Sequence, residues 1–209
     1  ALVSDGRGLG RHDGVVVLVE DALPGQLVRA RVAAVRKSLA EAALVEVLER
    51  SPYEQEPPCP HAGRCGGCSW QSLAYGRQLA WKERIVHDAL ERVGKVACPP
   101  MLPILPSPSE WGYRNKMEFA FGVSGDGGKA LGLRERGSRN IVGVTGCLLQ
   151  RPLTMRVLEA VRMLSNGAFH DLDGRFLVVR EPNAGGCFVE LIVGAGGSLE
   201  AGERLAEAL

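Results

Sequence analysis

The chain has 209 residues, which is enough for two small domains at the usual size of about 100–200 residues each. Hydrophobic residues make up 45% of it and charged residues 23%, so a disordered tail is excluded and buried cores are expected. The 25 basic and 24 acidic residues leave a net charge of +1, which excludes a uniformly basic nucleic-acid-binding protein.

The charge is nevertheless uneven along the chain. Residues 59–151 carry 13 basic and 7 acidic side chains, whereas both flanking segments are acidic overall. This distribution suits a polyanion bound against the middle of the chain, or simply an uneven solvated surface. No apolar run reaches the roughly 20 residues of a membrane span, and the N-terminus lacks the layout of a secretory signal. These features predict a cytoplasmic protein that does not associate with membranes.

The first 58 residues read as short strands separated by glycine-rich turns. Strands are predicted over residues 14–19 and 27–35 from β-branched content and period-2 alternation. Residues 40–50 suit either a helix or a strand, because Ala, Glu and Leu favour helix while the apolar positions alternate. Four prolines within residues 51–60 then predict a linker into a new unit.

The clearest helix is predicted over residues 73–93, with Ser72 as its N-cap and Gly94 at its end. Its apolar side chains form one stripe at helical spacing. They are Tyr75, Leu79, Val86, Leu90 and Val93. Residues 98–111 are again rich in proline, which predicts an irregular connection.

A second group of elements follows this connection. A strand over residues 113–123, a turn at 125–128 and a strand over 130–135 predict a hairpin. Pro152 is suited to open a helix that runs to about Leu164. Residues 175–181 and 187–193 predict another strand pair. The last predicted helix, 199–209, runs to the final residue without a cap, which indicates part of a longer protein.

Three of the six cysteines crowd into ten residues. Cys59, Cys65 and Cys68 share one short loop, where Gly66 and Gly67 permit the bend that lets two thiolates reach one centre. Cys147 is the best candidate for a fourth ligand. Thiolate ligands suit tetrahedral zinc or an iron–sulfur cluster. Zinc ribbons usually have two Cys-x2-Cys pairs, whereas here there is one pair with an outlying cysteine on each side, and this asymmetry favours the cluster. The alternative is a set of buried core cysteines.

The remaining candidates for chemistry are weaker. His61 is either a zinc ligand or a surface histidine, and Cys98 and Cys187 have no partner spacing, so neither is predicted to be a nucleophile. The glycine-rich turn over residues 193–198 resembles a nucleotide-binding turn, but Leu199 stands where the third glycine belongs. No cofactor-binding residue is assigned from it.

Ordered motifs in this sequence resemble a known family. Gly6-Arg7-Gly8-Leu9-Gly10-Arg11 with Leu23-Pro24-Gly25 resembles the TRAM domain, a small OB-like β-barrel that binds RNA. The cysteine loop with Gln71, Gln78-Leu79 and Lys82 resembles the cluster segment of the RNA uracil-5 methyltransferases, especially the 23S ribosomal RNA enzymes that carry a [4Fe–4S] cluster. Tyr113-Arg114-Asn115-Lys116, Leu131-Gly132-Leu133-Arg134 and Cys147 resemble that family's central domain. The match covers about residues 2–151.

The resemblance implies a fold class of mixed β and α+β type. Residues 1–51 would form the TRAM-like barrel, with residues 40–50 as a strand, and residues 57–209 an α+β domain that binds the cluster. The implied ligands are Cys59, Cys65, Cys68 and Cys147. The family's methyl donor is S-adenosylmethionine, used on a C-terminal Rossmann-like domain that this chain does not contain. No catalytic residue is therefore carried over.

An RNA partner, ribosomal RNA rather than tRNA, requires cations for its phosphates and flat groups for its bases. The expected RNA contacts are Arg7, Arg11, Arg114, Lys116, Arg134 and Arg136. Arg114 and Lys116 are expected on one strand of a hairpin, with Arg134 and Arg136 beside them on the paired strand. The alternative is that this face of the hairpin is only solvated and binds no RNA. Trp70, Trp81 and Trp111 are expected in the core rather than against bases. We expect a monomer. Two other functions remain open: an RNA-binding module with a structural zinc, and a redox-responsive iron–sulfur regulator.

Overall fold

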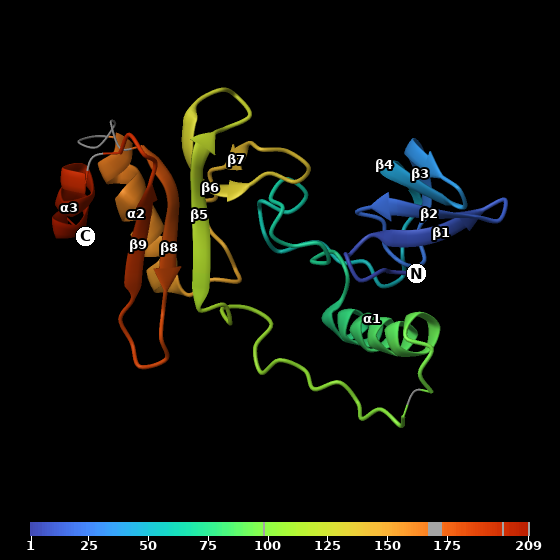
Figure 1. Ribbon diagram of the computed structural model, residues 1–209. Coiled ribbons are helices and arrows are strands. Elements are labelled where there is room, and N and C mark those ends of the chain that lie inside the picture. Colours follow the sequence, from blue (N-terminus) through green and yellow to red (C-terminus); the bar gives the residue numbers. More distant parts are fainter. Residues whose placement is uncertain (98, 167–172, 198, 209) are drawn as a thin grey trace. The chain divides into compact units, whose positions relative to one another are not determined.

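The computed structural model describes residues 1–97, 99–166, 173–197 and 199–208. The chain forms two compact units, each assembled from two separate segments (Figure 1). The first unit contains Ala1–Pro58 and Cys68–Ser107, and the second contains Cys59–Gly67 and Pro108–Leu209. The cysteine-rich stretch is therefore divided, with residues 59–67 in the second unit although the flanking residues lie in the first.

The first unit is built on a four-stranded sheet. Its strands are β1 (Gly8–His12), β2 (Val15–Glu20), β3 (Leu27–Arg36) and β4 (Leu39–Glu49), in the order β1-β2-β4-β3. The predicted strands are confirmed, and residues 40–50 form a strand rather than a helix. Within residues 1–58, all of which the structure describes, no ladder joins the outer strands β1 and β3. The predicted OB-like barrel is therefore not confirmed.

The connection between β1 and β2 is a two-residue hairpin turn. Asp13 and Gly14 have φ angles of 47° and 81°, and His12 pairs with Val15 across the ladder. Positive φ at both central residues is the geometry of the type I′ turn, which favours Asp-Gly because few other residues tolerate it. The pairing between β2 and β4 is parallel, in contrast to the other two pairs of this sheet.

The helix of the first unit, α1 (Tyr75–Asp88), continues into a short π-helical turn, η1 (Ala89–Val93). It begins two residues later than predicted, at an N-cap alanine, Ala74, that makes no side-chain capping bond. Leu73, just before it, is completely buried and packs with Leu2 and Leu23.

The apolar stripe predicted along this helix is covered only in part: Tyr75 and Leu79 are partly buried, whereas Val86, Leu90 and Val93 are exposed. None of the side chains of residues 75–88, which all lie in the described part of the chain, is fully buried. Val86 is 52% exposed and Val93 82%. Apolar spacing shows that a helix face is suited to burial, but another element must reach that face before burial occurs.

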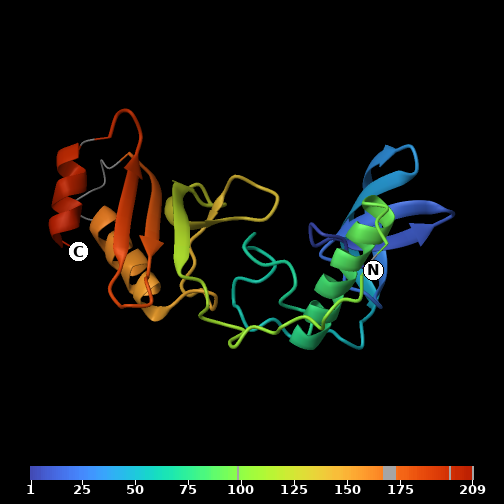
Figure 2. The same ribbon diagram turned by 60° about the horizontal axis from the view of Figure 1, so that its bottom comes forward.

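The second unit contains a five-stranded antiparallel sheet in the order β7-β6-β5-β8-β9. Its elements are β5 (Lys116–Val123), β6 (Lys129–Arg134), β7 (Ile141–Val142), α2 (Pro152–Asn166), β8 (Gly174–Arg180), β9 (Phe188–Val193) and α3 (Leu199–Ala208). These bounds confirm the two predicted hairpins and both predicted helices. Figure 2 shows β5, β8 and β9 side by side with α2 alongside them.

The core of the second unit lies between the sheet and α2. Apolar side chains from one face of the sheet meet apolar side chains of the helix, and the cluster includes completely buried residues. It consists of Met117, Phe119, Leu131, Val142, Val144, Val157, Leu158, Val161, Leu177 and Val179. Cys187, which directly precedes β9, packs against this cluster and is partly buried.

The N-terminus of α2 is capped by a buried carboxylate from the end of β8. Glu181 accepts a hydrogen bond from the backbone N–H of Thr154 at 2.6 Å and another from the Thr154 hydroxyl. Thr154 is 0% exposed and Glu181 7%. Such a cap satisfies first-turn N–H groups that have no partner within the helix.

Among the described residues, no helix combines the length and the apolar content needed to cross a membrane.

Candidate functional site

The cysteine loop of the second unit, residues 59–67, is bonded to the connection between β6 and β7. Cys65 forms an antiparallel bridge with Glu135. The N–H of Gly66 donates to the carbonyl of Arg134 at 3.0 Å, and the N–H of Arg136 donates to the carbonyl of Arg64 at 2.8 Å. The loop therefore docks through its backbone, so its position does not depend on side-chain packing alone.

His61 holds the same loop to a second point. Its Nε2 accepts a hydrogen bond from the Thr145 N–H at 3.0 Å and lies 3.2 Å from the Thr145 hydroxyl. Thr145 precedes Cys147 by two residues, so this contact links the cysteine loop to the segment that carries the distant cysteine. His61 thus has a structural partner in the second unit.

The four predicted ligands are all partly buried. Cys65 and Cys147 both pack against the core of the second unit, and the N–H of Gly67 points to the Cys65 sulfur at 3.4 Å. Cys68 begins the second segment of the first unit. Across residues 1–97, 99–166, 173–197 and 199–208, no group of three or more His, Cys, Asp or Glu side chains is arranged to hold a metal. The predicted four-cysteine centre is therefore not confirmed. Cys98 lies outside the described residues.

The turn that receives the loop is organised by Glu135. Its carboxylate accepts hydrogen bonds of 2.9 Å from the side chains of Asn140 and Ser138, and it faces the Arg64 guanidinium at 3.9 Å. The bonds from Asn140 and Ser138, with the charge of Arg64, hold the pKa of Glu135 below its ordinary value. The carboxylate is therefore ionised at neutral pH and accepts all of these contacts.

Arginines surround this docking point. Arg64 from the loop and Arg134 and Arg139 from the turn are exposed, and Arg136 is partly buried. Of these, sequence analysis predicts only Arg134 and Arg136 as RNA contacts. It does not name Arg64, which lies inside the cysteine loop, or Arg139, which follows Arg136 by three residues. We call these four arginines the arginine cluster.

The expected alignment of Arg114 and Lys116 beside Arg134 and Arg136 is wrong. The ladder between β5 and β6 runs from Ala120–Gly132 to Val123–Lys129, and Lys116 is instead paired with Arg180 of β8. The ladder with β5 ends at Gly132, and the next two residues of β6, Leu133 and Arg134, pair with Val142 and Ile141 of β7. Arg114 precedes β5 and bridges Gln150.

The two predicted contacts of the first unit differ in their surroundings. Arg7 pairs with Asp5 at 2.6 Å and with Glu41 at 3.6 Å. The hydrogen bond to Asp5 raises the pKa of Arg7 above its ordinary value. Its charge is thus partly neutralised locally, whereas Arg11 is exposed on β1.

Two of the three tryptophans have the predicted core positions. Trp70 and Trp81 pack against the Leu2, Leu23 and Leu73 cluster, and the indole N–H of Trp70 donates to the Gly6 carbonyl at 2.9 Å. Trp111 is partly buried.

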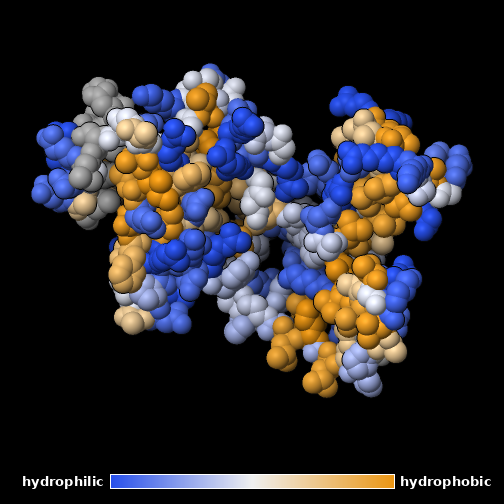
Figure 3. Space-filling view, in the orientation of Figure 1, coloured by the Kyte–Doolittle hydropathy of each residue, from blue (hydrophilic) through white to orange (hydrophobic). Residues whose placement is uncertain are grey.

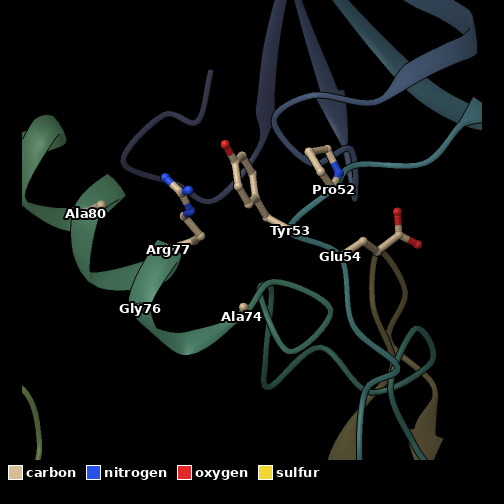
Figure 4. Close-up of a pocket in the computed structure, with 7 residues that line it drawn as sticks. All are labelled: Pro52, Tyr53, Glu54, Ala74, Gly76, Arg77 and Ala80. Atoms are coloured by element: carbon tan, nitrogen blue, oxygen red, sulfur yellow. The ribbon is translucent and has the colours of Figure 1, made fainter.

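A shallow pocket of about 440 Å³ lies in the first unit, at the start of α1. Figure 4 shows the Arg77 guanidinium turned toward the Tyr53 ring. The Cζ atom of Arg77 lies 3.7 Å from the centre of the ring. The Glu54 carboxylate points away from them and binds Gln26 and Arg50. The Ala74 N–H also donates to the Tyr53 carbonyl at 3.1 Å. These contacts tie the end of the strand segment to α1.

Comparison with known proteins found relatives over most of the chain. An uncharacterized RNA methyltransferase of Nitratidesulfovibrio vulgaris is 46% identical over 201 residues, which cover 92% of this chain and 43% of that protein. An uncharacterized RNA methyltransferase of Thermosynechococcus vestitus is 37% identical, and the match covers 78% of this chain and 36% of that protein. Another, from Caldanaerobacter subterraneus, is 46% identical, and the match covers 63% of this chain and 29% of that protein.

These similarities support the RNA methyltransferase family for this chain. The chain spans about two fifths of the length of the first of these relatives and less of the others. No family model matches the sequence.

Proposed function

We propose that this chain is the RNA-binding and iron–sulfur-binding part of an S-adenosylmethionine-dependent RNA uridine C5-methyltransferase that acts on 23S ribosomal RNA. The observation that carries the proposal is the 46% identity over 92% of the chain with a protein named as an RNA methyltransferase. The motifs over residues 2–151 supply the finer assignment to the uracil-5 type. Within it, residues 1–51 are the TRAM-like RNA-binding part and residues 57–209 the cluster-binding part.

Methyl transfer belongs to the whole protein. Because the matched region is 43% of the relative, we assign S-adenosylmethionine binding and catalysis to the part of such proteins that this chain does not match. The role of the present chain is to bind and position the RNA. An enzyme that modifies a base inside a folded RNA must extract that base from its stack, so firm contacts to the surrounding backbone are required.

The proposed cluster ligands are Cys59, Cys65, Cys68 and Cys147. Support comes from the docking of the loop beside the segment of Cys147 through His61 and Thr145, and from the shared core on which Cys65 and Cys147 pack. The Gly67 N–H donates to the Cys65 sulfur at 3.4 Å, and hydrogen bonds to the sulfurs are among the interactions by which a protein tunes an iron–sulfur cluster. A bound [4Fe–4S] cluster would supply a covalent cross-link between loop and core, the role of a structural metal.

Substituting Cys65 by serine is expected to abolish the cluster. The 209-residue chain, purified without oxygen, should contain about four iron and four sulfide per molecule, and Cys65→Ser should contain neither. Cys187→Ser is the matched control, because Cys187 is also partly buried against the second-unit core but outside the ligand set. Stoichiometric zinc without sulfide would instead establish a zinc site. Equal iron in Cys65→Ser and the wild type would refute this ligand assignment.

The arginine cluster is proposed to contact RNA phosphates. Exchanging Arg134 and Arg139 for glutamate should weaken binding of a 23S-derived oligoribonucleotide at least tenfold. It should also reduce the slope of log affinity against log salt, by about 0.7 for each single-strand phosphate that is no longer neutralised. Fluorescence anisotropy at several salt concentrations measures both quantities. The control is Arg156→Glu, on exposed Arg156 of α2. A salt slope equal to that of the wild type would contradict the assignment.

A further inference from the structure

The five-stranded sheet of the second unit has a second face, turned away from the core with α2. Residues directly opposite each other on neighbouring strands share a face. Lys116 of β5 pairs with Arg180 of β8, and Arg180 pairs with Phe188 of β9. The next residue along each strand, Met117 on β5 and Val179 on β8, points into the buried core. Lys116, Arg180 and Phe188 therefore form one row across three strands on the outer face, which we call the Phe188 row.

Phe188 is unusually open for an aromatic residue in a strand. Its side chain is 70% exposed, and Ile192, which lies on the same face of β9, is 38% exposed. Figure 3 shows hydrophobic side chains over β8 and β9 bordered by hydrophilic ones on the face toward the viewer. Contiguous apolar area left in water has an unfavourable free energy, so Phe188 and Ile192 together make this part of the face a candidate binding surface.

The charges around the ring indicate the kind of partner. Lys116 and Arg180 are both exposed and extend the row from the ring with two cations. Glu118 and Glu190 lie in the next row of the same face, on either side of Val178, which is 3% exposed. Negative groups of a partner are therefore favoured along the Phe188 row and disfavoured beside Val178. Protein–protein interfaces are enriched in aromatic residues and arginine but depleted in lysine, so within this row Lys116 is the residue that favours a polyanionic partner over a protein.

We propose that a single-stranded RNA segment crosses β5, β8 and β9 along the Phe188 row. One unstacked base stacks on the Phe188 ring, and the adjoining phosphates bind Arg180 and Lys116. Sheets that display aromatic rings between cations are a recurrent platform for unpaired RNA, because every base has a flat face that stacks and every linkage has a negative charge. This inference rests on the proposed RNA-binding function and adds the specific surface, of which sequence analysis named only Lys116.

The test measures the affinity of the full 209-residue chain for a fluorescein-labelled 12-nucleotide single-stranded RNA, from the fluorescence anisotropy of the RNA. Phe188→Ala should weaken binding at least fivefold, the effect expected for loss of one stacked base. Phe188→Tyr, which keeps a flat ring, should stay within about twofold of the wild type. Arg180→Gln should reduce the salt slope by about 0.7. The matched control is Met163→Ala, which removes an apolar side chain that is 69% exposed on α2.

The outcomes separate this inference from the proposed function. If the wild type binds the RNA and Phe188→Ala binds it equally well, the Phe188 row is refuted while RNA binding stands. If the wild type binds no RNA, both fail. If Phe188→Ala leaves RNA binding unchanged but alters self-association in sedimentation, the row is a protein interface and the RNA proposal for it is wrong. A circular dichroism spectrum equal to that of the wild type shows that each variant is folded.

Discussion

Replacing Gly132 by alanine is expected to destabilise the second unit by about 2–3 kcal/mol, the usual cost of forcing extra volume into a packed site. A Cβ at this position would lie 2.0 Å from the carbonyl oxygen of Val142 and 2.9 Å from its carbonyl carbon. Both atoms belong to the backbone, so no change of rotamer relieves the clash. Strand β7 would have to move, and with it Ile141 and Val142, which are 2% and 4% exposed.

Urea denaturation followed by circular dichroism measures this effect as a lower midpoint at an unchanged slope. The control is Gly146→Ala in the same unit, because a Cβ at Gly146 meets no heavy atom within 4 Å. If the two variants unfold at the same urea concentration, the close approach of β7 to Gly132 is not a constraint on the fold.

Removing the carboxylate that caps α2 is the second large effect. Glu181→Ala leaves the Thr154 N–H and hydroxyl without their acceptor at a position with 0% exposure. A buried donor without a partner costs about 1–3 kcal/mol, and two donors lose their acceptor here, so about 3 kcal/mol is expected. Glu181→Gln, which keeps one acceptor oxygen, should be destabilised less.

The double variant with Thr154→Val tests whether the destabilisation comes from this hydrogen bond. Once the threonine hydroxyl is absent, Glu181→Ala should cost measurably less, and the difference gives the coupling energy between the two side chains. The control is Glu190→Ala, since Glu190 is exposed on β9. Fully additive costs in the double variant would show that the hydroxyl of Thr154 does not contribute to the cap.

The predictions from sequence succeed where a periodic pattern decides the structure. Alternating residues around Met117 and Phe119 predict β5 and its buried face, and Pro152 correctly marks the start of α2. Propensity leaves residues 40–50 open, because Ala, Glu and Leu favour helix while the apolar positions alternate. The strand is fixed by its ladders to β2 and β3, which local propensity does not report.

The docking of the cysteine loop could not be predicted in this way. The loop is held by backbone hydrogen bonds between Gly66 and Arg134 and between Arg136 and Arg64, and backbone groups leave no pattern of side-chain types. The pairing of Lys116 with Arg180 is missed for a related reason. Alternation assigns a residue to a face, but the neighbouring strand on that face depends on sheet order, which local spacing does not report.

The division of the chain has a practical consequence for anyone who wishes to dissect it. The polypeptide passes from one unit to the other three times, after Pro58, after Gly67 and after Ser107. A fragment that begins at Pro108 would lack residues 59–67, which belong to the same unit. A fragment that ends at Ser107 would contain these nine residues without the rest of the second unit. Neither unit can therefore be expressed complete as one continuous fragment without carrying a segment of the other.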